Sequence, residues 1–362
     1  MYSAIRPLLF RLDPEDAHAL TLTLIRLAGA LPPARALLRS IFTGPQVPVQ
    51  AFGLTFKNPV GLAAGYDKDG LGFQGLACLG FGHLEIGTVT PLAQPGNPRP
   101  RIFRLPEEQG VINRMGFPGK GVDFVVRQLQ GKPELRSNLR LKGVVLGLNL
   151  GKNKDTPLEN ASQDYLGLLR AFAPLADYLA INVSSPNTAG LRRLQAREAL
   201  EDLLAQLNQE RQAQALHLGR PVPLLVKLAP DLTDDELDDA LEVLVRTGMD
   251  GVIATNTTLS RDGLKRSSLP PSLPAIEAGG LSGAPLRQRS TQMVQKIYDR
   301  TGGKLPIIGV GGVMTPDDAR EKLDAGALLV QVYTGLVYAG PGFVKNILVS
   351  LGNPESKRPA SV

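Results

Sequence analysis

From residue 47 onward, short apolar runs alternate with amphipathic helical segments. Eight runs have the length and composition of buried strands: 59–64, 84–89, 144–150, 178–183, 224–228, 251–255, 307–310 and 328–333. Helical spacing of apolar positions is clear between several of them, for example at 198–214, 234–246, 286–300 and 316–325. Eight strand–helix units predict an α/β fold of the (β/α)8 TIM-barrel type. A doubly wound open sheet is the alternative; the count of eight and the lack of a G-x-G-x-x-G opening disfavour it.

Residues 1–44 have a different pattern, which predicts an amphipathic helical hairpin ahead of the barrel. Leucines recur at helical spacing between Leu20 and Leu31, Asp13-Pro14 suits a helix start, and Pro32-Pro33 separates a second short basic helix. Two interpretations are open. The hairpin packs on a core of its own, or it binds a membrane surface or an apolar ligand.

The chain therefore divides into an extension at 1–44, a barrel domain at 45–352 and a tail at 353–362, of which we expect residues 355–362 to be disordered. Two connections, 91–117 and 256–283, are too long for plain loops, and we expect them to cover the barrel mouth. The second contains Pro270-Pro271, and we expect it to be mobile.

The composition argues against several classes of site and of protein. The 362 residues are 43% hydrophobic and 20% charged, with one Cys and three His, so neither a disulfide framework nor a structural zinc site is expected and no metal is assigned. A net charge of +6 is spread along the chain without the aromatic-and-basic pattern of nucleic-acid binding. No apolar stretch is long enough for a transmembrane helix, and acidic residues interrupt any signal-peptide core.

Polar side chains follow the predicted strands at the barrel end where active sites form. The fourth run ends in Asn182, with Ser185 and Asn187 just beyond, and the fifth contains Lys227 inside an apolar stretch. A buried lysine is rare unless an anion or an electron-rich ligand pairs with it. Gly311-Gly312 before a helix start near Thr315, with 279–283, predicts a phosphate site that could take FMN or a sugar phosphate.

Five separated motifs carry a resemblance to a known family. They are GLAAGYDKDG at 61–70, NRMGF at 113–117, NLGKNK at 149–154, INVSSPNT at 181–188 and GVGG at 309–312. Together they resemble the dihydroorotate dehydrogenases over nearly the whole chain. The extension, with LDPEDAH at 12–18, and a serine instead of a cysteine at 185 resemble the quinone-dependent class 2 branch. Cys78 lies in the wrong place for the class 1 base, in a segment predicted to be a helix packed on the barrel.

The resemblance implies FMN as the cofactor. The residues implied to hold it are Ala64, Gly65, Tyr66, Asp67, Lys68, Thr88, Asn149, Asn182, Lys227 and Thr255, with Gly283, Gly312, Tyr333 and Thr334 at its phosphate. Lys227, near N1 and O2 of the flavin, would stabilise the negative charge that the arriving hydride leaves there. At about 4 Å that attraction is roughly 4 kcal/mol for an effective dielectric of about 20, before desolvation.

Dihydroorotate is implied to be the substrate, oxidised to orotate in pyrimidine synthesis. Its expected contacts are Lys68, Asn113, Arg114, Met115, Gly116, Phe117, Asn182, Asn187, Asn256 and Thr257. Ser185 is implied to remove the C5 proton while hydride passes from C6 to N5 of FMN. A free hydroxyl is a poor base, so its proton needs an exit, and Thr188 with water is our hypothesis for it.

A membrane quinone is the implied second substrate, with His18, Arg101 and Arg104 along its path and Tyr333 at its border. We accordingly expect a peripheral protein on the cytoplasmic face of the cell membrane; the sequence is compatible with a monomer. Other readings are a hydroxy-acid oxidase, which would need a histidine at a strand end, a class 1 relative, or a non-catalytic barrel that binds a phosphorylated ligand.

Overall fold

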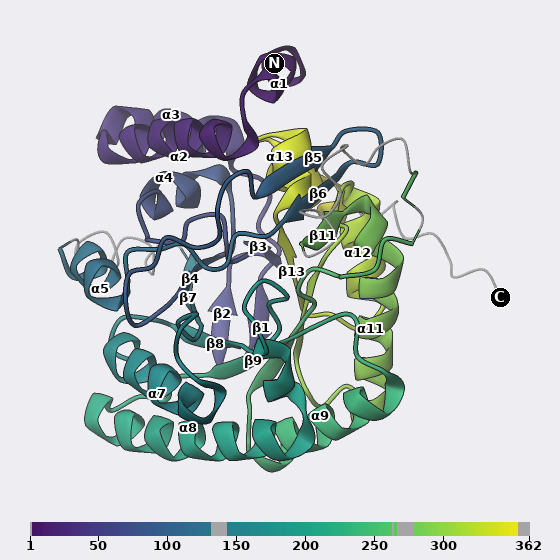
Figure 1. The fold of residues 1–362 in the computed structure, drawn as a ribbon. Helices are drawn as coiled ribbons and strands as arrows, with labels where there is room; N and C mark the ends of the chain where they lie inside the picture. The colour runs from purple at the N-terminus through teal and green to yellow at the C-terminus, as the bar shows by residue number, and fades with distance from the viewer. Residues whose placement is uncertain (1, 132–142, 263, 266–278, 354–362) are drawn as a thin grey trace.

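The computed structural model describes residues 2–131, 143–262, 264–265 and 279–353. Its centre is a closed barrel of eight parallel strands in the order β10-β12-β13-β3-β4-β7-β8-β9, as the sequence predicted (Figure 1). The strands are β3 (Val60–Leu62), β4 (His83–Val89), β7 (Val145–Leu150), β8 (Tyr178–Asn182), β9 (Leu224–Leu228), β10 (Gly251–Ala254), β12 (Ile307–Val310) and β13 (Leu329–Val332). They are buried on both faces, which is why they read as continuous apolar runs.

Helices surround this barrel, and their boundaries follow local signals. They are α4 (Phe73–Leu76), α5 (Val122–Gln130), α7 (Ala161–Phe172), α8 (Arg197–Leu218), α9 (Asp234–Arg246), α11 (Arg287–Thr301), α12 (Pro316–Asp324), α13 (Thr334–Ala339) and α14 (Phe343–Gly352). α9 begins with a capping box between Thr233 and Glu236, and α8 is followed by Gly219, whose left-handed conformation suits glycine. Cys78 is buried in a short 3₁₀ turn after α4.

The two long connections do form a cover. β5 (Ile102–Leu105) and β6 (Gly110–Asn113) come from the first, and β11 (Gly280–Gly283) comes from the second. They pair as an antiparallel sheet in the order β11-β6-β5, in which Gly280 lies opposite Asn113. Pro270-Pro271 and the tail at 355–362 lie outside the described residues.

A strand pair that the sequence analysis missed lies against the barrel core. β1 (Val49–Ala51) and β2 (Leu54–Phe56) form a hairpin, and Phe56 is fully buried in a cluster with Tyr178, Leu225 and Ile308. Its strands have three residues each, too few for a periodic signal.

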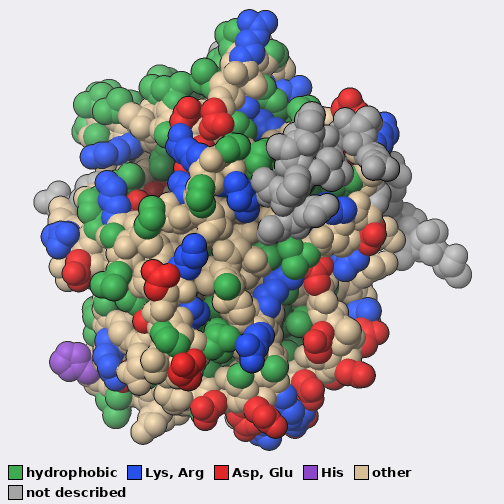
Figure 2. All heavy atoms as spheres, viewed as in Figure 1, with side chains coloured by type: hydrophobic (Ala, Val, Ile, Leu, Met, Phe, Trp, Pro, Cys, Tyr) green, Lys and Arg blue, Asp and Glu red, His purple; other side chains and the backbone are tan. Residues whose placement is uncertain are grey.

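The N-terminal extension has three helices rather than two. α2 (Pro14–Ala30) and α3 (Pro32–Phe42) are the predicted hairpin, and Asp13 caps α2 as expected, while α1 (Tyr2–Arg11) was not predicted. A self-packed core is contradicted, because only Ala17 and Gly29 of these helices are buried. α2 lies against α4 and α3 against the short 3₁₀ turn after α4, whereas α1 lies beside α13 (Figure 1). The outer surface of these helices is rich in apolar atoms (Figure 2).

Candidate functional site

A single cavity of about 550 Å³ connects the barrel mouth with the N-terminal helices. At one end it is lined by strand ends and cover residues, including Lys227, Asn182 and Asn113. At the other end it is lined by α1, α2 and α3, including Leu9, Ala17 and Leu38. The volume lies in the range of sites for cofactors and other small organic ligands.

Amide side chains converge at the barrel end, as predicted. Asn182 Nδ2 donates to Thr88 Oγ1 at 2.9 Å, and Asn256 Nδ2 donates to Asn182 Oδ1 at 3.2 Å. Asn187 Nδ2 donates to Asn113 Oδ1 at 3.1 Å, which joins the barrel loop to the cover. The amides are thereby fixed in orientation before any ligand enters. Asn187 Oδ1 is buried and has no partner among the described residues, so it is free to accept from a ligand.

Ser185 lies on the loop between two of these amides and is almost fully buried. Its Oγ accepts a hydrogen bond from the Asn187 backbone N–H at 3.2 Å. Among the described residues, no histidine or carboxylate is hydrogen-bonded to it. Thr188 Oγ1 is buried and without a partner in the same part of the chain. The loop is held from behind by Arg192, which donates to the carbonyls of Ser184 and Thr257 at 3.0 and 2.8 Å.

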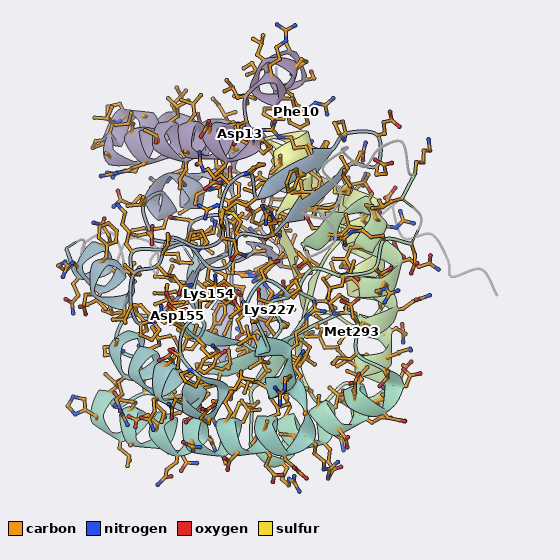
Figure 3. All side chains as sticks on the ribbon, in the orientation of Figure 1. Phe10, Asp13, Lys154, Asp155, Lys227 and Met293 are labelled. Carbon is orange, nitrogen blue, oxygen red and sulfur yellow. The ribbon has the colours of Figure 1, made fainter. Side chains whose placement is uncertain are left out.

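Two lysines line the barrel end of the cavity. Lys68 Nζ donates to the Gly65 carbonyl at 2.8 Å, and burial lowers the pKa of Lys68 to about 8, against the opposing effect of Glu15 and Asp69. Lys227 lies on β9 inside the barrel (Figure 3), where burial lowers its pKa and Glu85, 3.8 Å away, raises it. Both are placed to attract anionic groups of a ligand.

The phosphate site predicted for the ends of β12 and β13 has a glycine cradle. Gly283 and Gly312 line the cavity with positive φ angles of 92° and 74°. A Cβ would lie 2.2 Å from Gln109 O at the first and 2.2 Å from Arg287 Cα at the second, so the close packing of these segments beside the cavity requires glycine at both positions. Thr334 Oγ1 lies 2.9 Å from Ser282 Oγ beside them. The predicted helix start at Thr315 is used internally, because Thr315 and Asp318 cap each other.

Most predicted residues line the cavity. They are Ala64, Gly65, Tyr66, Lys68, Thr88, Asn113, Met115, Gly116, Phe117, Asn182, Ser185, Asn187, Lys227, Thr255, Asn256, Thr257, Gly283, Gly312, Tyr333 and Thr334, with His18 and Arg104 at the helical end. Four predicted residues do not line it.

Those four support its walls. Asp67 accepts from the backbone N–H groups of Leu71 and Gly72, and burial raises its pKa to about 6. Asn149 accepts from Thr88 and lies behind it. Arg114 donates to the carbonyl of Pro100 in the cover. Arg101 pairs with Glu15 of α2 at 2.7 Å.

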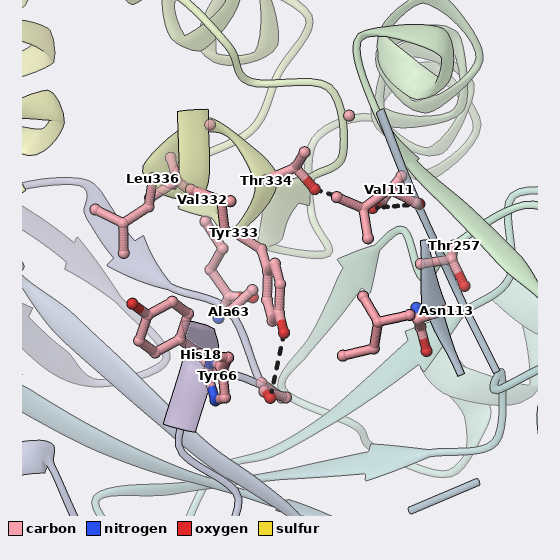
Figure 4. Close-up of a pocket in the computed structure, with 18 of the residues that line it drawn as sticks. His18, Ala63, Tyr66, Val111, Asn113, Thr257, Val332, Tyr333, Thr334 and Leu336 are labelled. Atoms are coloured by element: carbon pink, nitrogen blue, oxygen red, sulfur yellow. Dashed lines mark hydrogen bonds between the residues drawn. The ribbon is translucent and has the colours of Figure 1, made fainter. Parts of the chain in front are cut away.

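The passage from the barrel to the helices is bordered by aromatic rings (Figure 4). The rings of His18 and Tyr66 lie edge to face at 4.9 Å, and those of Tyr66 and Tyr333 at 5.7 Å. Burial lowers the pKa of His18 to about 4, so this imidazole is neutral at physiological pH. Beyond the rings the lining is almost wholly apolar, which suits a hydrophobic ligand.

Two polar residues of the barrel interior were missed by the sequence analysis. Gln331 lines the cavity, and its Nε2 donates to Glu85 Oε2 at 2.8 Å. The two missed residues are Glu85 and Gln331, and each is flanked by apolar residues, in Leu84-Glu85-Ile86 and Val330-Gln331-Val332. A single polar residue flanked by apolar ones was the available signal.

A flavin fits the residues present. The cavity has a glycine cradle at one side, an amide cluster at the other and a lysine between strands at its floor. The donor set matches a ligand that carries both a phosphate and a ring with hydrogen-bonding edges. Among the described residues, no group of three or more His, Cys, Asp or Glu side chains is placed to hold a metal ion.

Comparisons with known proteins agree with this geometry. Residues 46–353 match the family model described as dihydroorotate dehydrogenase. "Dihydroorotate dehydrogenase (quinone)" of Burkholderia thailandensis is 50% identical over 361 residues, covering 99% of this chain and 100% of the relative. The protein of the same name from Thiobacillus denitrificans is 51% identical, covering 97% and 99%. The crystal structure of DHODH from Eimeria tenella in complex with ferulenol superposes with a TM-score of 0.83 at 40% identity, covering 94% and 90%.

Proposed function

This chain belongs to the dihydroorotate dehydrogenase family, in its quinone-dependent class, and we propose that its cavity places FMN between a dihydroorotate site and a quinone passage. It is a flavoenzyme that oxidises dihydroorotate in pyrimidine biosynthesis with a quinone as electron acceptor. The observation that carries the proposal is the continuity of one cavity from the amide cluster, past Lys227, to the apolar helices.

The glycine cradle and Thr334 would hold the FMN phosphate, and Lys227, Thr88 and Thr255 would face its ring system. When bound, FMN supplies a hydride acceptor that can pass electrons onward. Lys227 adds a positive charge where negative charge develops, which stabilises the reduced state more than the oxidised state.

Dihydroorotate would lie against the four amides of Asn113, Asn182, Asn187 and Asn256. Their donors and acceptors match the edge of a pyrimidine ring, and Lys68 matches its carboxylate. β6 brings Asn113 from the cover, so the cover also excludes water from the reacting atoms.

Ser185 would remove the proton from C5 of the substrate. Its Oγ must release its own proton as it does so, and no base is hydrogen-bonded to it among the described residues. Thr188 Oγ1, three positions on, is buried, has no hydrogen-bond partner within the described part of the chain, and would pass that proton to water. This order of transfer needs no ionised serine in the resting protein.

The helical end would admit the quinone, with His18, Arg104 and Tyr333 along its path. Arg104 donates to the carbonyl of Leu12 at 3.0 Å and lies 4.6 Å from the Phe10 ring, so it also fixes α1 against the cover. The outer face of the helices exposes a group of large apolar side chains: Ile5, Leu8, Leu12, Leu20, Leu24, Leu27, Leu31, Leu37 and Ile41.

That face would rest on a lipid surface, on the cytoplasmic side of the cell membrane, where quinone can enter directly. Within the described ranges, the helices are too short or too polar to cross a bilayer.

The direct test is spectroscopic. The purified protein should be yellow, release FMN on denaturation, lose its colour when dihydroorotate is added without oxygen, and regain it on addition of a short-chain quinone. A colourless protein that binds only a phosphorylated ligand would replace the proposal with the non-catalytic barrel. A flavoprotein that dihydroorotate cannot bleach would point to another substrate.

A further inference from the structure

A buried carboxylate lies inside the barrel beneath the cavity floor. Glu85 is on β4 and its side chain has no exposed surface. Its Oε1 accepts from Asn149 Nδ2 at 2.8 Å, and its Oε2 accepts from Tyr178 Oη at 3.0 Å and from Gln331 Nε2 at 2.8 Å. Three donors from three other strands thus bind both oxygens of this carboxylate and fix its position.

Lys227 is the cation that Glu85 faces. Its Nζ lies 3.8 Å from Glu85 Oε1, longer than a hydrogen bond, and its side chain is 6% exposed, toward the cavity that it lines. Direct donors to Glu85 come from Asn149, Tyr178 and Gln331, so the ammonium group keeps its own hydrogen bonds for a ligand. A charge buried in this way needs a counter-charge nearby to stay ionised.

The other ionisable groups around this pair do not replace the carboxylate. His83 on β4 is kept neutral, since burial lowers its pKa to about 3. Burial raises the pKa of Tyr178 on β8, which therefore stays protonated. Lys68 lines the same cavity as a second cation. Among the described residues, Glu85 is thus the anion that acts on Lys227.

We propose that Glu85 is a positioning residue for the reaction: it is the buried counter-ion that keeps Lys227 protonated, with the ammonium group directed toward the flavin. The inference rests on the FMN site proposed above. Burial disfavours the charged form of Lys227, and Glu85 is the negative charge that opposes this effect. Without Glu85, Lys227 would therefore lose its proton at a lower pH. The flavin would then lose the positive charge that favours its reduced state.

The test is the FMN midpoint potential of purified holoprotein, measured across pH 6 to 9 for wild type and Glu85→Gln. At low pH Lys227 is protonated in both proteins, so removal of a negative charge should raise the potential of the variant. As pH rises, Lys227 of the variant should lose its proton, and its potential should fall relative to wild type. The midpoint potential reports how much more tightly the protein binds reduced FMN than oxidised FMN. Relative to wild type, this affinity ratio of the variant should fall by on the order of tenfold or more as the pH rises.

Lys227→Met supplies the matched background. In this background, addition of Glu85→Gln should raise the potential by the same amount at every pH, because Lys227 is no longer present to titrate and Lys68 titrates in both of the proteins compared. A potential of Glu85→Gln that stays above the wild-type potential by a constant amount from pH 6 to 9 would overturn the proposal, since it would show that Lys227 keeps its proton unaided. Tyr178→Phe, which removes one donor but keeps both charges, controls for loss of packing and should not bring a fall with rising pH.

If Glu85→Gln does not yield a folded flavoprotein, Glu85→Asp serves in its place. The carboxylate then retreats by one methylene, so the same relative fall should occur at higher pH. An absent shift in that variant would also count against the counter-ion role. Failure of the wild-type protein to bind any flavin would instead reject the function proposed above, so the two failures are distinguishable.

Discussion

The barrel end of the cavity and its N-terminal end differ in how their walls are held. At the barrel end, the amide side chains of the wall are fixed by other polar side chains: Asn182 by Thr88, Asn256 by Asn182, and Asn187 by Asn113. At the helical end the lining is apolar, and α1 to α3 bury only Ala17 and Gly29. One end presents fixed hydrogen-bonding groups, and the other presents an apolar surface.

This difference separates two kinds of recognition along one cavity. A polar ring is selected by matched donors and acceptors, because an unmatched buried group is costly. A hydrophobic ligand is selected mainly by shape and by the polar groups near its head, a role for which we propose His18, Arg104 and Tyr333. Changes at one end should therefore alter one half-reaction and spare the other.

The largest difference between the effects on the two half-reactions is expected for Ser185→Ala. Loss of a positioned proton acceptor should slow flavin reduction by dihydroorotate by about 10²- to 10⁴-fold, while FMN stays bound. Stopped-flow absorbance under anaerobic conditions measures it. Reoxidation of the chemically reduced variant by quinone should match wild type. Wild-type reduction rates would remove Ser185 from the mechanism.

The opposite effect, a slower quinone half-reaction with flavin reduction spared, is expected for Ala17→Trp in α2. Ala17 is buried and lines the helical end, so a large ring there should obstruct the passage and lower kcat/KM for quinone by roughly 10- to 100-fold. Turnover with a soluble artificial acceptor should stay near wild type. Ala30→Trp, at an exposed position of the same helix, is the control. Equal losses with both acceptors would mean that the helices serve the whole structure, not the quinone step.

The barrel end was also the more predictable part of the chain. Strands buried on both faces give continuous apolar runs, and parallel strands bring their ends together, so Asn182 and Lys227 could be placed from sequence. Glu85 and Gln331 were missed, because each is a single polar residue in an apolar run and the sequence does not show that their side chains meet across the barrel. α1 was missed because Pro7 lies inside it and its apolar residues do not face a core. The prediction of a self-packed hairpin was wrong for a related reason. Apolar periodicity identifies the apolar face of a helix, but it does not show what that face packs against.

A smaller, pH-dependent effect is expected at the barrel end. The pKa of Lys68 is lowered to about 8 by burial, and only its protonated form attracts the substrate carboxylate. Thus kcat/KM for dihydroorotate should be maintained below pH 8 and fall about tenfold for each unit above it. Lys68→Arg, which keeps the charge at high pH, should extend the plateau whatever its absolute rate. A plateau that ends at the same pH in both proteins would assign the alkaline limb to another group.

The smallest effect is expected on the outer face of the helices. Arg26 is exposed on α2, among the leucines that we place against lipid. A basic residue near an anionic membrane contributes about 1 kcal/mol, so Arg26→Gln should weaken binding to vesicles containing anionic lipid by about fivefold. Sedimentation with vesicles measures this, and high salt should abolish the difference because it screens exposed charges. Lys304→Gln removes an exposed charge between α11 and β12, outside the N-terminal helices, and should leave binding unchanged. Equal losses for both variants would show that net charge attracts the vesicles, and that the N-terminal face is no better placed for lipid than the rest of the surface.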